Sequence, residues 1–155
     1  MYGRTTDKGE NTVDAKKEFY RLMEEQTTMA LATCAHGQPN VRIVNFYFDK
    51  EAQVVRFSTF MDNDKVKEIT ENDQVAFTTV PTFGTEHVKA KGMVRRSEHT
   101  VREVADRFIQ KNSGFRFVLE QAGDALILFE IAFLSATITL DLMNIATYHL
   151  AGEEE

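Results

Sequence analysis

The sequence predicts a mainly β protein of the α+β class, built as an antiparallel barrel or curled sheet with flanking helices. Side chains along residues 40–49 fall into two alternating sets, and small or apolar residues alternate with mainly polar ones along residues 86–97, which is the two-residue period of a half-buried strand. Turn sequences such as His36-Gly37-Gln38-Pro39 separate successive strands, as in antiparallel hairpins. Six or more such strands in meander order, with helices inserted at their connections, indicate this architecture.

Each expected element rests on a local pattern. Phe19 and Leu22 lie at helical spacing behind Asp14, a residue type that favours a helix N-terminus. Helices are expected at residues 14–26, 64–72 and 100–112, and a turn or helix at 113–123. Strands are expected at residues 28–35, 40–49, 53–60, 74–80, 86–97, 125–134, 136–142 and 145–150.

The composition is that of one ordinary globular domain. Of the 155 residues, 43% are hydrophobic and 27% are charged, which is enough chain to bury a core without disulfides. We expect a single domain at residues 13–150. A disordered polar lead-in is expected at residues 1–12 and a solvated acidic tail at residues 151–155.

Charge and cysteine content exclude several classes of protein. The single Cys34 leaves no internal disulfide and fits a reducing compartment. The sequence has no apolar signal core and no run of roughly 20 apolar residues, so a cytoplasmic protein without a membrane span is expected. The formal net charge of −6 disfavours sequence-independent nucleic-acid binding, which requires a basic face.

Residues 57–67 combine several groups that attract anions. An apolar strand ends in Ser58 and Thr59, a polar turn follows, and a helix opens with Lys65 on its first turn. Backbone amides at a helix start, hydroxyls and an ammonium all favour an anion, so the stretch predicts a phosphate-sized pocket. The alternative is an ordinary strand–turn–helix junction in which Asp64 caps the helix.

Four short motifs occur in order between residues 19 and 95. They are Arg42-Ile43-Val44, Phe57-Ser58-Thr59, Asn63-Asp64-Lys65 and Val88-Lys89-Ala90-Lys91-Gly92. With the preceding small-residue strand and Gly-x-Pro hairpin, this set resembles the pyridoxamine 5′-phosphate oxidase-like family of flavin-binding split barrels. The resemblance implies a six-stranded antiparallel split β-barrel, and a homodimer with two FMN sites at the subunit interface.

The resemblance also assigns residues to the phosphate end of FMN. Arg42 and Lys65 are implied to hold the phosphate. Ser58 and Thr59 are implied to line the phosphate or ribityl end, and Asn63 is implied to offer a further polar contact. A phosphate dianion suits this pair of cations, because arginine offers a forked donor and lysine a point charge.

At the ring end, backbone groups of Ile43, Val44 and Asn45 are implied to meet the isoalloxazine ring. His87 stands where the family often has a polar residue that approaches the ring. A flavin requires an apolar slot with a few placed polar groups, and the protein then supplies orientation while the flavin supplies the redox chemistry. No catalytic side chain is assigned, since none need act as an obligate acid or base.

Two departures separate the chain from the true pyridoxamine phosphate oxidases that it resembles. Asp64 replaces the basic residue that precedes the lysine in those enzymes, and its carboxylate repels a phosphate unless it turns away. Residues 141–150 differ from the arginine- and histidine-bearing segment that holds the B6 substrate. We therefore expect a small FMN-dependent oxidoreductase with a different partner, either a reduced nucleotide or a small organic molecule.

Other functions remain open at this stage. A flavin-binding or storage protein without turnover fits the missing substrate segment. Relatives with this barrel bind haem or a deazaflavin, and His87 and His149 are candidate haem ligands. The four histidines lack tight metal spacing, so no zinc site is expected. The sequence contains no nucleophile elbow, P-loop or Gly-x-Gly-x-x-Gly motif.

Overall fold

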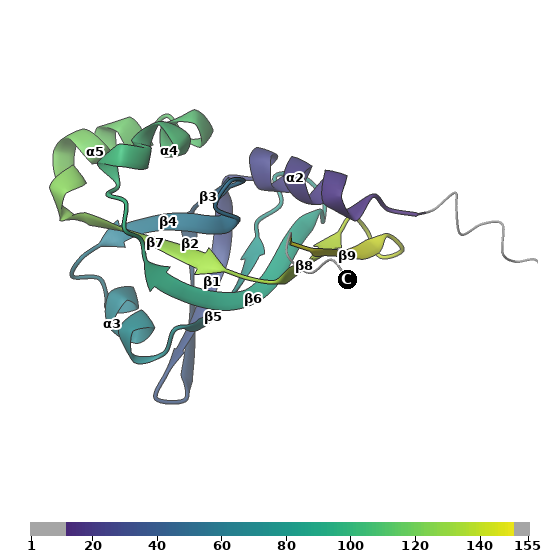
Figure 1. The fold of residues 1–155 in the computed structure, drawn as a ribbon, viewed down its shortest axis with the longest axis horizontal. Helices are drawn as coiled ribbons and strands as arrows, with labels where there is room; N and C mark the ends of the chain where they lie inside the picture. The colour runs from purple at the N-terminus through teal and green to yellow at the C-terminus, as the bar shows by residue number, and fades with distance from the viewer. Residues whose placement is uncertain (1–11, 151–155) are drawn as a thin grey trace, which may run out of the picture.

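The computed structural model describes residues 12–150, and the strands of this part join in one antiparallel sheet (Figure 1). Their order along the sheet is β2-β1-β5-β6-β7-β4-β3, and a hairpin of β8 and β9 extends β6. The expected lead-in and acidic tail lie outside the described residues, except for residue 12. The strands are β1 (Thr28–Ala35), β2 (Gln38–Asn45), β3 (Tyr47–Asp49), β4 (Val54–Phe60), β5 (Gln74–Thr79), β6 (His87–Arg96), β7 (Leu126–Ala132), β8 (Ser135–Thr139) and β9 (Ile145–His149).

Six longer strands form the wall of a split barrel, which confirms the predicted fold class. β1, β2, β4, β5, β6 and β7 have six to ten residues each, whereas β3, β8 and β9 have three to five. The register places Leu31, Phe77 and Ala90 opposite one another on neighbouring strands, and all three are buried. Since side chains alternate between the two faces of a strand, this row defines the inner face of the barrel.

The first hairpin is tighter than expected. His36 and Gly37 both have positive φ, 53° and 75°, and they alone connect β1 to β2. Positive φ at both central residues is the geometry of the two-residue hairpin turn that matches strand twist. The predicted turn residues Gln38 and Pro39 therefore belong to β2.

The predicted strand at 40–49 is in fact two strands, so the predicted meander of the first half is wrong. The chain leaves β2 at Phe46, whose backbone N–H donates to Thr27 O at 3.3 Å. β2 pairs with β1, whereas β3 pairs with β4, and the two lie at opposite edges of the sheet. Phe46 and Phe48 remain buried in the core. The alternation continues across the break, so it could not reveal the change of partner.

Four α-helices flank the barrel (Figure 1), within the part of the chain that the structure describes. α2 inserts Phe19 and Leu22 into the interior beside β3 and β9, and α3 packs against β1 at the opposite end. The predicted helix at 100–112 is instead a 3₁₀ turn, Arg102–Val104, followed by a shorter α-helix. The helices are α2 (Ala15–Glu25), α3 (Asp64–Glu71), α4 (Ala105–Lys111) and α5 (Phe115–Ala122), with a second 3₁₀ turn at Gly123–Ala125.

Two apolar clusters hold the fold together. The larger fills the barrel and includes Phe19, Phe57 and Ile131, while the smaller joins Tyr47 and Phe108 beneath α4 and α5. Full burial of one such side chain stabilises the fold by roughly 1.5–3 kcal/mol, so both clusters contribute substantially. α4 and α5 thus cover the outer face of β3, β4 and β7. None of the helices within residues 12–150 is long and apolar enough to cross a membrane.

Candidate functional site

The barrel is open along a line between β2 and β4, which we call the split. Among the described strands β2 pairs with β1 alone. The Val41 N–H bonds to the Asn40 side chain at 2.9 Å, so it points away from β1, and the N–H of Ile43 shares this direction by strand alternation. Across the split, β3 pairs only with Val54–Arg56, which leaves the rest of this β4 edge without a described strand partner.

Lys65 points into the barrel from the start of α3, beside the split. Asn63 is the N-cap, and its side-chain Oδ1 accepts a hydrogen bond from the Lys65 backbone N–H at 2.9 Å. The suggestion that Asp64 caps the helix is therefore wrong, because Asp64 is the exposed first helical residue. Lys65 is only 6% exposed, and its Nζ donates to Thr59 Oγ1 at 2.7 Å.

This lysine has spare capacity for an acceptor. Within residues 12–150 its ammonium forms one hydrogen bond, to Thr59, and no ion pair. Burial lowers the pKa of Lys65, the nearby charge of Arg42 lowers it further, and Glu68 partly offsets both effects. An ammonium offers three donors, and a buried charge without a counter-ion is costly. An anion placed here would therefore gain two free donors and relieve an unfavourable charge.

Arg42 reaches the same region from the inner face of β2. Its Nη1 donates to Thr33 Oγ1 at 2.8 Å and to Leu31 O at 3.3 Å, and its Nη2 pairs with Glu68 Oε1. We refer to Thr33, Arg42, Thr59, Lys65 and Glu68 as the split cluster. β1, β2, β4 and α3 all contribute to it, so only the folded barrel brings these residues together.

Glu68 is a member of the split cluster that sequence reasoning missed. It accepts hydrogen bonds from Thr33 at 3.2 Å and Asn40 at 3.2 Å, besides its pair with Arg42. Desolvation raises the pKa of Glu68, but the bond from Asn40 and the charge of Arg42 outweigh it and the net pKa is lowered. Its position three residues after Lys65, on the same helical face, was the available signal.

The other residues proposed to bind the cofactor lie around the split rather than inside the split cluster. Thr59 faces the interior, and Ser58 alternates to the outer face. Val44 packs against the core, whereas Ile43 is 60% exposed and Asn45 is also exposed. The Ile43 edge is thus open to a ligand, while Ser58 is separated from the Lys65 ammonium by the sheet.

His87 lies far from the split cluster in the sheet. It opens β6, and β1 and β5 lie between β6 and β2. Its Nδ1 lies 2.7 Å from Thr85 O, an acceptor, so Nδ1 carries the proton and Nε2 presents a lone pair. The side chain follows the outward positions of β6, opposite to buried Val88.

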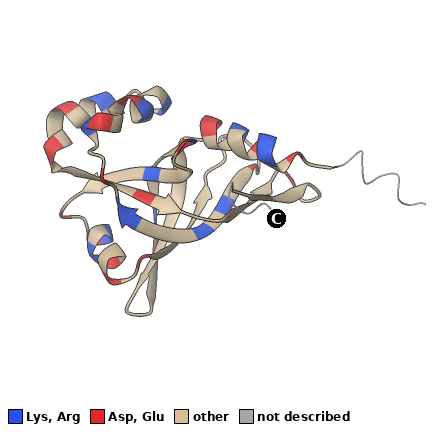
Figure 2. Cartoon of the chain, viewed as in Figure 1, with Lys and Arg blue, Asp and Glu red and all other residues tan. Residues whose placement is uncertain are grey.

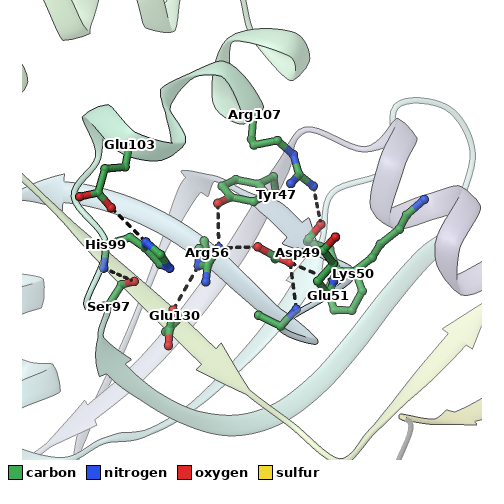
Figure 3. A network of polar contacts seen from close by, with 12 residues as sticks. Tyr47, Asp49, Lys50, Glu51, Arg56, Ser97, His99, Glu103, Arg107 and Glu130 are labelled. Atoms are coloured by element: carbon green, nitrogen blue, oxygen red, sulfur yellow. Dashed lines mark hydrogen bonds and ion pairs between the residues drawn. The ribbon is translucent and has the colours of Figure 1, made fainter.

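A second charged cluster lies on the outer face beneath α4 (Figure 3). Arg56, 5% exposed, donates to Tyr47 at 3.2 Å and pairs with Asp49 and Glu130. Desolvation raises the pKa of Glu130, but hydrogen bonds from Arg95 and Arg56 outweigh it and hold the pKa below its usual range. We refer to Tyr47, Asp49, Arg56, Arg95 and Glu130 as the outer cluster, in which the buried cation already has two carboxylate partners.

A family model described as pyridoxamine 5′-phosphate oxidase-like matches residues 22–145. The chain belongs to this family. The match spans both sides of the split and every residue of the split cluster. No curated protein sequence matches the chain.

Solved structures share the fold of this pyridoxamine 5′-phosphate oxidase-like chain at low sequence identity. General Stress Protein 26 from Bacillus anthracis str. Sterne has a TM-score of 0.71 and 16% identity, over 89% of this chain and 100% of that chain. A haem-binding protein from Mycobacterium smegmatis has a TM-score of 0.71 and 10% identity, over 88% of this chain and 58% of that chain. HutZ, a haem-storage protein from Vibrio cholerae, has a TM-score of 0.63 and 15% identity, over 86% of this chain and 93% of that chain. These likenesses establish the split-barrel fold and leave the ligand open.

Proposed function

We propose that this chain is an FMN-binding flavoprotein and a small oxidoreductase, with the flavin phosphate held at the split cluster. The observation that carries the proposal is the Lys65 ammonium, which is buried, close to Arg42 and bonded to a single hydroxyl. Such a group is expensive without a counter-ion. A phosphate is the counter-ion that the family resemblance supplies.

The donor set fits a phosphate and a flavin ring. Lys65 and Thr59 offer an ammonium and a hydroxyl, and Arg42 adds a guanidinium at the same place. The unpaired edge of β2 at Ile43 offers backbone groups for a ring with alternating donors and acceptors. When bound, the flavin would accept and pass on electrons, and this chain would bind and orient it.

The substrate is proposed to differ from that of a true pyridoxamine phosphate oxidase. No arginine or lysine follows Arg116 in the sequence. The two hairpin strands at this end, β8 and β9, carry mainly threonine, alanine and isoleucine. A B6 phosphate would therefore find few cations at this hairpin. We retain a reduced nucleotide or a small organic molecule as the electron donor, and a nucleotide would have to place its own phosphates away from this hairpin.

A homodimer with the cofactor at its interface is part of the proposal. α4 and α5 pack beside Tyr47 of β3 and Leu128 of β7, which lie toward the other end of the sheet order from β1 and β2. Val41 and Ile43 in β2 and Met93 in β6 are exposed, at 62%, 60% and 55%. Exposed apolar residues on these strands support association with a second copy.

The test is a titration of apoprotein with FMN, read by flavin fluorescence quenching. We expect the double variant Arg42→Ala, Lys65→Ala to weaken FMN binding by about a hundredfold, because each charged hydrogen bond contributes about 1.5–3 kcal/mol. A matched control, Lys16→Ala with Arg116→Ala, removes two cations from exposed helix positions. Full flavin occupancy of the Arg42/Lys65 double variant would overturn the site assignment.

Turnover separates the oxidoreductase from a flavin-storage protein. We expect a steady rate of NADH or NADPH oxidation by the FMN-loaded protein, followed at the nucleotide absorbance. Tight FMN binding with no reduction of the flavin by any nucleotide would instead assign a storage role. Both outcomes leave the binding site at the split cluster in place.

Haem is the second candidate ligand, and His87 favours it. With Nδ1 bonded to Thr85 O, the free Nε2 has the tautomer that a metal-ligating histidine uses. HutZ and the Mycobacterium smegmatis protein show that their versions of this fold take haem. An absorption spectrum after haem addition tests this: a Soret band lost in His87→Ala assigns haem, and a purely flavin spectrum excludes it.

A further inference from the structure

Glu68 is already paired with the arginine that the proposed phosphate would use. Its Oε1 pairs with Arg42 and also accepts from Thr33, and its Oε2 accepts from Asn40. The Arg42–Glu68 pair is only partly exposed, with 21% and 19% of the side-chain surfaces open. The arginine implied to hold the phosphate thus already has a carboxylate partner inside the protein.

The charge count of the split cluster makes this partner important. Arg42 and Lys65 contribute two positive charges and Glu68 one negative charge, so the cluster carries +1. A phosphate dianion would bring it to −1 in a largely buried place. With Glu68 neutral, the same site would reach zero. Like charges at short range in a partly buried site repel strongly, because the effective dielectric constant is low.

The surroundings do not compensate for Glu68. A cavity of about 570 Å³ borders Glu68, and its lining also includes the carboxylates of Asp64 and Glu71. Lys67 and His36 are the basic residues of that lining, and His36 is paired with Glu71 at 2.7 Å. Figure 2 likewise shows acidic positions on α3. A phosphate approaching from this side meets more negative than positive charge.

We propose that Glu68 is an internal competitor for the flavin phosphate, which keeps FMN exchangeable and narrows the preference for FMN over riboflavin. The inference rests on the proposed function of the split cluster and concerns the regulation of that same site. The phosphate has to displace Glu68 from Arg42, or bind beside it against its charge. Flavin without a phosphate does not meet this penalty.

The experiment titrates FMN and riboflavin, separately, into three apoproteins. Glu68→Gln keeps the shape and the hydrogen-bonding reach of the side chain but removes its charge. Glu71→Gln is the matched control, since it makes the same change one turn later on α3, beside the same cavity. Riboflavin serves as an internal check that the ring site of each variant is folded, and thermal unfolding provides a second check.

We expect Glu68→Gln to tighten FMN binding about tenfold, the effect of removing one like charge from a partly buried site, and to leave riboflavin binding unchanged. Glu71→Gln should alter neither affinity by more than about twofold. If wild-type protein binds FMN and Glu68→Gln leaves the ratio of FMN affinity to riboflavin affinity unchanged, the proposed role of Glu68 is overturned while the proposed FMN site stands. No FMN binding by any of the three proteins would overturn the proposed function itself.

Discussion

The split cluster and the outer cluster have similar parts but differ in how far their charges are matched. Each has a buried cation on or beside β4. Lys65 donates to Thr59 on the inner face of β4, and Arg56, three residues before Thr59 in the same strand, lies on the outer face. Arg56 has two carboxylates and a phenol as partners, whereas Lys65 has one hydroxyl. A satisfied network of this kind fixes structure, and an unsatisfied cation invites a ligand.

The difference follows from what each face packs against. The outer face of β4 lies next to β3 and β7, which present Asp49 and Glu130 to Arg56 at fixed register. The inner face near Thr59 lies where β3 has already ended and the split begins. β7 pairs with β4 at this point but places apolar Ile127 opposite Thr59, so within the described residues neither strand supplies a carboxylate to Lys65. The cation beside the gap in the sheet is therefore also the one that has no carboxylate partner within the described residues.

The largest expected effect is loss of stability on removal of the outer cation. Arg56→Met removes the buried cation shared by Asp49, Glu130 and the Tyr47 hydroxyl, while Glu130 keeps Arg95 and Asp49 keeps two backbone N–H donors. We therefore expect a loss of about 3 kcal/mol, the lower end for a broken buried ion pair. Urea unfolding measures it. The folded pKa values of both carboxyls are lowered in the wild type, so their stabilisation is present above the unfolded pKa and disappears in acid.

The control for this substitution is Arg96→Met, on neighbouring β6. Arg96 is exposed, and within the described part of the chain it forms no ion pair. We expect a change within about 0.5 kcal/mol. FMN affinity should stay unchanged in both variants. If folded Arg56→Met loses FMN binding, the outer cluster is not purely structural, and the contrast with the split cluster is wrong.

A third cation, Lys111, sharpens the comparison by its pH dependence. Lys111 donates to Met23 O at 2.8 Å and lies 3.9 Å from the centre of the Phe46 ring, and burial lowers its pKa to about 8. Below that value the lysine is charged in both states. Between about 8 and the unfolded value of 10.5 the unfolded chain binds more protons, so the free energy of unfolding rises with pH.

We expect this rise to amount to roughly 2 kcal/mol and to vanish in Lys111→Met, measured as the difference between the two proteins from pH 7.5 to 10. Taking the difference cancels other titrating groups, such as Tyr148 with its pKa raised to about 12. Parallel curves for the two proteins would show that Lys111 carries no buried charge penalty.

The smallest expected effect distinguishes two adjacent residues on opposite faces. Thr59→Val removes the hydroxyl bonded to Lys65, so we expect FMN affinity to fall about fivefold, close to the value of one hydrogen bond. Ser58→Ala should change it by less than about twofold, because Ser58 faces outward. Fluorescence titration measures both. A larger effect for Ser58→Ala would place the phosphate on the outer face.

Much of the fold follows from local pattern. The helix behind Asp14 is present with that residue as its cap, and the alternation along 86–97 matches the buried positions Val88, Ala90 and Val94. Such patterns need only the residues themselves, because strand and helix periods are local properties. The break at Phe46 was not predicted, because the alternation is local and stays intact when a strand changes its pairing partner.

The candidate site was only partly open to sequence reasoning. Arg42, Thr59 and Lys65 were named through a resemblance to a family, and the structure places them in one cluster. Glu68 was missed, because its contact with Arg42 joins residues 26 positions apart. The outer cluster was missed altogether, since Arg56 and Glu130 lie 74 positions apart.

The sequence by itself determined most of the strands and helices, the family and the cations available for an anionic ligand. The tertiary structure decided which of those cations are neutralised. That depends on the split: pairing along β4 brings carboxylates to Arg56, whereas β3 ends before Lys65, which has no carboxylate partner within residues 12–150. Charge matching is a property of three-dimensional neighbours, so only the folded barrel could separate the paired arginine of the outer cluster from the lysine that we propose to bind a phosphate.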